Sequence, residues 1–123
     1  MVNKIKIKFI KADSLKLSAF CFVWRFNMNI FHKAKIYQTA ALACEVKQSL
    51  AFSTQVLSSV GRFCRQDWGE ISEEDKAVNA DALKYKDFLL GAYKTCKGKI
   101  FITAESTDKI EYDIITVMFP SDY

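Results

Sequence analysis

The chain has few residues of the types that perform covalent or proton-transfer chemistry. It contains one histidine, His32, and four cysteines, and no two cysteines have the Cys-x-x-Cys spacing of a zinc or redox site. His32 lies between Phe31 and Lys33, and no serine or cysteine lies in the context of a nucleophile elbow or a catalytic triad. We therefore expect no enzyme activity, no metal site and no cofactor.

The cysteines fit reduced thiols better than disulfides. Cys21, Cys44 and Cys64 lie within apolar patterns, where a free thiol behaves as a small hydrophobic side chain. Reduced core thiols are typical of a cytoplasmic protein. No apolar run approaches the roughly 18 residues that cross a bilayer, so we expect no membrane partner.

The residues suited to recognition gather in two places. The segment 67–75 sets Trp68 among acidic residues, and the end of the chain carries Phe119 and Tyr123. Aromatic side chains often dominate protein interfaces, although Trp68 could instead close the core and Tyr123 could lie against the last strand. The acidic residues lack the spacing and the turn glycine of a calcium loop. The candidate partner-binding residues are Asp67, Trp68, Glu70, Glu74, Tyr93, Glu105 and Tyr123.

A basic N-terminal arm offers a second kind of recognition. Residues 1–37 carry eight basic residues against Asp13 alone, a net charge of +7, so the remainder carries −3 of the total +4. Only this arm could attract phosphates, and it supports a nucleic-acid-binding alternative. The same lysines could instead protect an edge strand from pairing with other molecules. The nucleic-acid candidates are Lys4, Lys6, Lys8 and Lys11.

Strands are expected near the N-terminus to position these residues. Residues 4–11 alternate lysine with Ile5, Ile7 and Phe9, the period of a half-buried strand. Residues 15–26 are apolar on both alternating faces, which predicts a strand covered on both sides or, if it is uncovered, a dimer interface. A short strand is plausible between residues 30 and 37.

Three helices are expected in the middle of the chain. Thr39 could cap a helix with apolar residues at four-residue spacing, at Leu42, Val46 and Leu50. Ser53 could cap a second helix, whose apolar stripe is Val56, Leu57, Val60, Phe63 and Cys64. Ser72, followed by three acidic residues, is the strongest helix start in the chain, because the acids face the positive end of the helix dipole.

Three strands are expected at the end of the chain, at residues 88–95, 99–105 and 112–119. Gly98 supplies the positive φ of a tight hairpin, and residues 106–111 form a polar turn. The core candidates of this meander are Ile100, Ile102, Ile114, Val117 and Phe119. The prediction is an α+β fold in which an antiparallel sheet, the C-terminal three-stranded meander plus the N-terminal strands, packs against about three helices.

An ordered series of short motifs runs through the second half of the chain: Asp67-Trp68-Gly69, Glu74-Asp75, Asn79, Ala82-Leu83, Leu90-x-Ala92-Tyr93, Ile102, Glu105 and Pro120-x-x-Tyr123. On these motifs, residues 28–123 resemble a family of small, largely uncharacterised bacterial proteins often labelled plasmid-related. Gln66 stands where the family has glycine, and Phe101 where it has tryptophan.

The resemblance implies carriage on a mobile element and divides the chain into an N-terminal extension, residues 1–27, and one domain, residues 28–123. A start at Met28 would leave twelve basic against thirteen acidic residues, a net charge of −1, and would remove most of the case for phosphate binding. We therefore expect a non-catalytic interaction protein, monomeric or homodimeric. Its expected action is to inhibit a host defence nuclease, in the manner of anti-CRISPR or antirestriction proteins, by direct contact with the protein complex.

Overall fold

The structure is a computed structural model that describes residues 7–8 and 29–123. In these residues three α-helices pack on a mixed sheet, which confirms the α+β fold class. The elements are, in chain order, β1 (Ile7–Lys8), the 3₁₀ turn η1 (Asn29–Phe31), β2 (Lys35–Gln38), α2 (Ala40–Gln48), α3 (Leu50–Cys64), α4 (Glu73–Tyr85), β3 (Leu89–Thr95), β4 (Gly98–Glu105), β5 (Ile114–Met118) and the 3₁₀ turn η2 (Pro120–Asp122).

The strands lie in the order β1-β2-β5-β4-β3. Strands β3, β4 and β5 form the predicted antiparallel meander, with Gly98 at φ 95° in its hairpin. Strand β2 pairs with β5 in parallel, so the expectation of an entirely antiparallel sheet was wrong. The physical reason is the connection: three helices and two strands separate β2 from β5, and such a long crossover allows parallel pairing.

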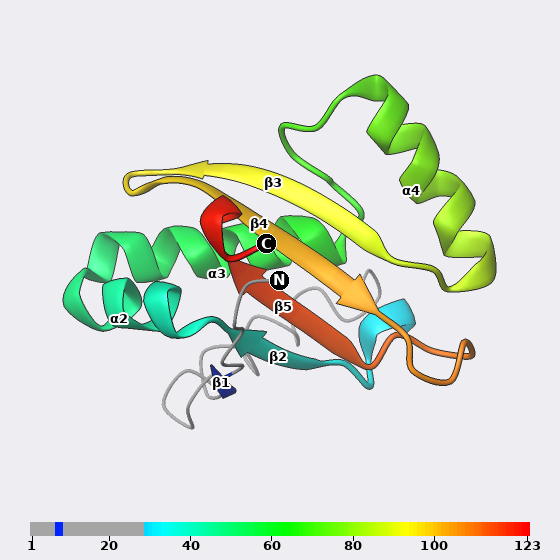
Figure 1. The fold of residues 1–123 in the computed structure, drawn as a ribbon, viewed down its shortest axis with the longest axis horizontal. Helices are drawn as coiled ribbons and strands as arrows, with labels where there is room; N and C mark the ends of the chain where they lie inside the picture. The colour runs from blue at the N-terminus through cyan, green and yellow to red at the C-terminus, as the bar shows by residue number, and fades with distance from the viewer. Residues whose placement is uncertain (1–6, 9–28) are drawn as a thin grey trace.

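Helices α2 and α3 lie together against one face of the sheet, which we call the inner face (Figure 1). Val56, Val60 and Phe63 of α3 and Ile100 and Ile102 of β4 belong to one buried core, and each was predicted as a core residue. Of the other core candidates, Val117 is fully buried, whereas Ile114 alternates onto the opposite, outer face of the sheet and is only half-buried.

Helices α3 and α4 begin at local serine caps, whereas the residue before α2 makes a distant contact. Ser72 caps α4 by accepting a hydrogen bond from the backbone N–H of Asp75 at 3.1 Å, as predicted. Helix α3 begins four residues earlier than expected, because Ser49 is its cap and Ser53 is a buried residue inside it. Thr39 precedes α2 without capping it, since its hydroxyl donates to Asp122 Oδ2 at 2.7 Å.

Several further expectations changed or lie outside the described residues. The strand expected from residue 30 begins at Lys35, after η1, and Leu50 starts α3 with an exposed side chain instead of packing with α2. Cys64 is buried as predicted, but Cys44 and Cys96 are exposed. Of the strand predicted over residues 4–11, β1 covers Ile7–Lys8. The rest of it and the whole of residues 15–26 lie outside the described residues.

Candidate interaction surface

The segment between α3 and α4 closes the free edge of β3. The backbone N–H of Ala92 donates to the carbonyl of Trp68 at 3.0 Å, and the N–H of Glu70 donates to the carbonyl of Ala92 at 2.7 Å. Gly69 lies between them at φ 75°, and a Cβ there would fall 2.1 Å from the Ala92 carbonyl oxygen. Only glycine combines this backbone conformation with so close an approach. The Asp-Trp-Gly motif therefore forms backbone hydrogen bonds with the edge strand β3.

The side chains around this segment tie it to α3 and to the core. Trp68 is buried with its ring edge-on to Phe63, at a centroid distance of 5.2 Å. Tyr93 is fully buried and donates its hydroxyl to the Asp67 carbonyl at 2.7 Å. Burial raises the pKa of Tyr93, so its hydroxyl stays a donor. Trp68 and Tyr93 therefore position the edge segment and are too buried to contact a partner.

Asp67 completes this arrangement through its carboxylate. Arg62 Nε donates to Asp67 Oδ2 at 2.8 Å, and the Gly69 N–H donates to Asp67 Oδ1 at 3.1 Å. The bond from Arg62, followed by the bond from Gly69, holds the pKa of Asp67 below its usual value. The guanidinium of Arg62 also lies 5.2 Å from the Tyr93 ring centroid. Asp67 is thus engaged within the fold.

The remaining predicted partner residues are divided between three regions. Glu70 is exposed, with a carboxylate oxygen 3.7 Å from Lys94 Nζ. Glu74 is exposed on the first turn of α4, and Glu105 is half-buried on the outer face of the sheet. Tyr123 is 51% exposed. The structure therefore does not gather the predicted residues into one site.

Helix α4 presents the surface that sequence reasoning missed. It stands beside β3, away from α2 and α3 (Figure 1), and only Asn79 and Ala82 of its thirteen residues are buried. It also carries two large exposed apolar residues, Val78 at 62% and Tyr85 at 64%. The signal was present in the sequence, because residues seven apart in a helix lie on one face.

The anchor of α4 is the side-chain amide of Asn79. Its Nδ2 donates to the Leu90 carbonyl at 2.8 Å, and the Leu90 N–H donates to its Oδ1 at 3.3 Å. The Asn79 amide therefore satisfies the backbone N–H and carbonyl of Leu90 on the edge of β3, as a neighbouring strand would. Two residues later, the backbone of Ala92 is satisfied by Trp68 and Glu70. Glu74, Val78, Asp81 and Tyr85 form a stripe of exposed residues along one side of the helix, which we call the α4 stripe.

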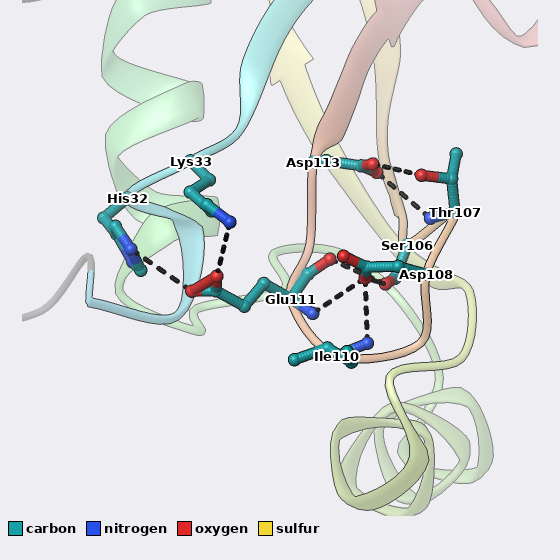
Figure 2. Close-up of polar contacts among 8 residues, drawn as sticks. All are labelled: His32, Lys33, Ser106, Thr107, Asp108, Ile110, Glu111 and Asp113. Carbon is teal, nitrogen blue, oxygen red and sulfur yellow. Dashed lines mark hydrogen bonds and ion pairs between the residues drawn. The ribbon is translucent and has the colours of Figure 1, made fainter.

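The β4–β5 loop is held by its own acidic side chains. Asp108 Oδ1 accepts the N–H of Ile110 at 2.9 Å, the N–H of Glu111 at 3.1 Å and the Ser106 hydroxyl at 3.1 Å, as Figure 2 shows. The two backbone donors hold the pKa of Asp108 below its usual value. The carboxylate of Asp108 thus stabilises the loop as an Asx-type turn.

The only histidine belongs to the same region. Glu111 Oε1 lies 3.2 Å from His32 Nε2 and Glu111 Oε2 lies 3.0 Å from Lys33 Nζ (Figure 2), which joins the turn after η1 to the loop. Asp113 accepts from the backbone and the hydroxyl of Thr107. These polar groups hold two chain segments together, and this is a sufficient role for His32.

Two other expectations concern metals and the N-terminal arm. Across residues 7–8 and 29–123, no group of three or more metal-ligating side chains comes together. In the same part of the chain, no helix is both long and apolar enough to cross a membrane. Lys8 lies in β1, paired with Tyr37 of β2, whereas Lys4, Lys6 and Lys11 lie outside the described residues.

Comparison with known proteins does not assign this chain to a class of protein. No family model, no curated protein and no solved structure matches the chain. The described residues define an α+β protein with a mixed sheet and a partly detached helix.

Proposed function

We propose that this protein is a non-catalytic interaction protein that binds a partner protein through the α4 stripe. The observation that carries the proposal is the exposure of Val78 and Tyr85 on a helix that contributes only Asn79 and Ala82 to the buried interior. An exposed tyrosine is a frequent source of binding energy at interfaces. The two side chains lie two helical turns apart, a spacing typical of a helix that binds in a groove.

The charges on the stripe indicate the chemistry of the partner. Glu74 and Asp81 flank the two apolar residues, and Asp81 is only loosely paired, at 3.9 Å from Lys84 Nζ. A complementary partner surface would combine an apolar groove with cationic side chains at its rim. Basic surfaces of this kind are common on proteins that act on nucleic acids.

The proposed partner is a component of a host defence nuclease complex. Residues 29–123 carry twelve basic and thirteen acidic residues, a near balance that is unsuited to imitating the phosphate density of DNA. Inhibition of a nuclease would therefore act through direct protein contact. The resemblance of residues 28–123 to plasmid-related proteins supports this choice, because mobile elements gain from blocking host defence.

Binding and cleavage assays with purified defence nucleases test the proposal. The double variant Val78→Ala, Tyr85→Ala should weaken binding at least tenfold, since truncation of an interface anchor costs about 2 kcal/mol or more. Lys76→Ala is the matched control, a residue on the same helix whose ion pair, with Glu73, lies outside the stripe. Undiminished cleavage by CRISPR and restriction nucleases in the presence of the wild-type protein would exclude the inhibitor function.

The charge reversal Glu74→Lys, Asp81→Lys separates electrostatic from apolar recognition. A partner with a basic rim should bind this variant more slowly, and the difference should shrink as salt is added. Equal association rates for the variant and the wild type would exclude a basic rim and would leave only an apolar groove.

A further inference from the structure

The outer face of the sheet carries two lysines in direct opposition. Lys94 of β3 and Lys99 of β4 are Cα partners in the antiparallel ladder, so both side chains project from the same face. Like charges directly opposite each other destabilise a sheet. The nearest acid to Lys94 is Glu70, whose carboxylate oxygen lies 3.7 Å from Nζ, a weak and exposed ion pair. An anionic ligand would relieve this repulsion.

Aromatic rings adjoin the two lysines on the same face. Phe101, two residues after Lys99 and opposite Ala92, lies edge-on to Tyr123 with ring centroids 5.9 Å apart. Tyr123 in turn lies 6.3 Å from Phe88. Phe88 and Tyr123 are 40% and 51% exposed, so part of each side chain is open to solvent. We call Phe88, Phe101 and Tyr123 the aromatic cluster.

The position of Tyr123 is fixed by the turn that precedes it. Asp122 Oδ2 accepts the Thr39 hydroxyl at 2.7 Å and the Phe119 N–H at 3.2 Å, which holds η2 against the start of α2. The Tyr123 N–H donates to the Pro120 carbonyl at 3.1 Å. The chain segment that carries the ring is thus ordered before a ligand binds, which lowers the entropy cost of binding.

Ala92 of β3 and Thr103 of β4 are buried on the outer face, so its accessible part includes only some residues of these two strands and the end of the chain. Thr116 and Met118 of β5, on the same face, are fully buried. Glu105 lies on β4 at the end farther from the lysines, so positive charge is concentrated at the hairpin end. The surface is thus a row of rings with cations at one end.

We infer that the aromatic cluster together with Lys94 and Lys99 forms a binding site for a short stretch of single-stranded nucleic acid. Unstacked bases stack on aromatic rings whatever their identity, and lysines beside the rings attract the phosphates. A duplex hides the faces of its bases and cannot use such a platform. This site is separate from the α4 stripe and from the arm lysines.

Fluorescence anisotropy with a labelled oligothymidylate tests the inference on the full-length protein. The lysines of the arm are first replaced, Lys4→Gln, Lys6→Gln, Lys8→Gln and Lys11→Gln, to remove their contribution. In this background Tyr123→Ala should weaken binding about tenfold, within the range measured for loss of one stacked base. Tyr123→Phe keeps the ring and should bind like the parent. It also controls for any disturbance of η2.

The cation pair is tested separately. Lys94→Gln with Lys99→Gln should reduce the slope of log affinity against log salt by about 1.4, the value for two phosphate contacts on a single strand. Lys84→Gln removes an exposed lysine elsewhere and should leave the slope unchanged. A duplex of the same length should bind clearly more weakly than the single strand.

Three results would overturn the inference. The first is loss of all oligonucleotide binding when the arm lysines are replaced. The second is equal affinity for single strand and duplex. The third is an unchanged affinity for the oligonucleotide in Tyr123→Ala; loss of defence-nuclease binding by the same variant would then make the aromatic cluster a protein contact.

Discussion

Helices α3 and α4 follow each other in the chain and have opposite relations to the core. Eight of the fifteen residues of α3 are buried, among them Val56, Val60 and Phe63, whereas α4 buries two of thirteen. The sequence of α3 is accounted for by packing. Packing does not account for the outer residues of α4, since the side chains of Val78 and Tyr85 are mostly exposed. The comparison teaches that the conspicuous aromatic of the motif, Trp68, serves the fold, while the less conspicuous Tyr85 is available to a partner.

The largest expected effect comes from removing a ring that α3 contributes to the core. Phe63 is fully buried between Phe31, at a centroid distance of 5.5 Å, and Trp68, at 5.2 Å. Phe63→Ala should lower the free energy of unfolding by about 3–5 kcal/mol, because the lost burial is joined by the cost of a cavity. Urea titration followed by circular dichroism measures it. A loss below about 1 kcal/mol would contradict the packing described for α3.

A smaller loss is expected where α4 is attached to the sheet. Asn79→Ala leaves the N–H and carbonyl of Leu90 without their side-chain partner and should cost about 1–3 kcal/mol. Hydrogen exchange gives the sharper measurement: the Leu90 amide should lose protection while the Ala92 amide, which donates to Trp68, keeps it. Equal loss at both amides would mean that the edge of β3 opens as one unit with α4.

The start of α4 and the apolar stripe of α3 could be predicted from the sequence because their causes are local. Ser72 binds an amide three residues away, and the stripe needs only the helical period. The predicted cap of α3, Ser53, was wrong because Ser49 and Ser53 are one helical turn apart and both precede apolar residues at suitable spacing. Local patterns fix the existence of an element better than its boundary.

The distant contacts could not be predicted in the same way. The hydroxyl of Thr39 binds Asp122, 83 residues later, and the carbonyl of Trp68 accepts from Ala92. The burial of Trp68, Tyr93 and Tyr123 depends on where neighbouring chain segments pack against the sheet, for example where Gly69 pairs with Ala92 of β3. Such packing is set by the order of all the strands, which local sequence patterns do not give.

A pH-dependent effect is expected where α3 is tied to the edge segment. The pKa of Asp67 is held below its usual value by Arg62, so the ion pair contributes stability above about pH 4 that is lost as the pH falls through the lower folded-state pKa. Because both side chains are partly exposed, the contribution should be below about 1 kcal/mol.

Thermal unfolding between neutral and acidic pH measures this contribution. Arg62→Gln and Asp67→Asn should each flatten the acid limb of the melting-temperature profile, and the double variant should flatten it no further. Additive effects of the two substitutions would show that they act on different interactions and would contradict the pairing.

The smallest effect on stability is expected from the substitutions that matter most for the proposed function. Val78→Ala with Tyr85→Ala removes side chains that are mostly exposed, and alanine favours the helix, so the free energy of unfolding should change by less than about 0.5 kcal/mol. The same urea titration used for Phe63→Ala measures it. A loss above about 1 kcal/mol would show that the α4 stripe serves the fold. In that case the contrast between the two helices would disappear, and weakened partner binding by this variant would no longer locate the interface.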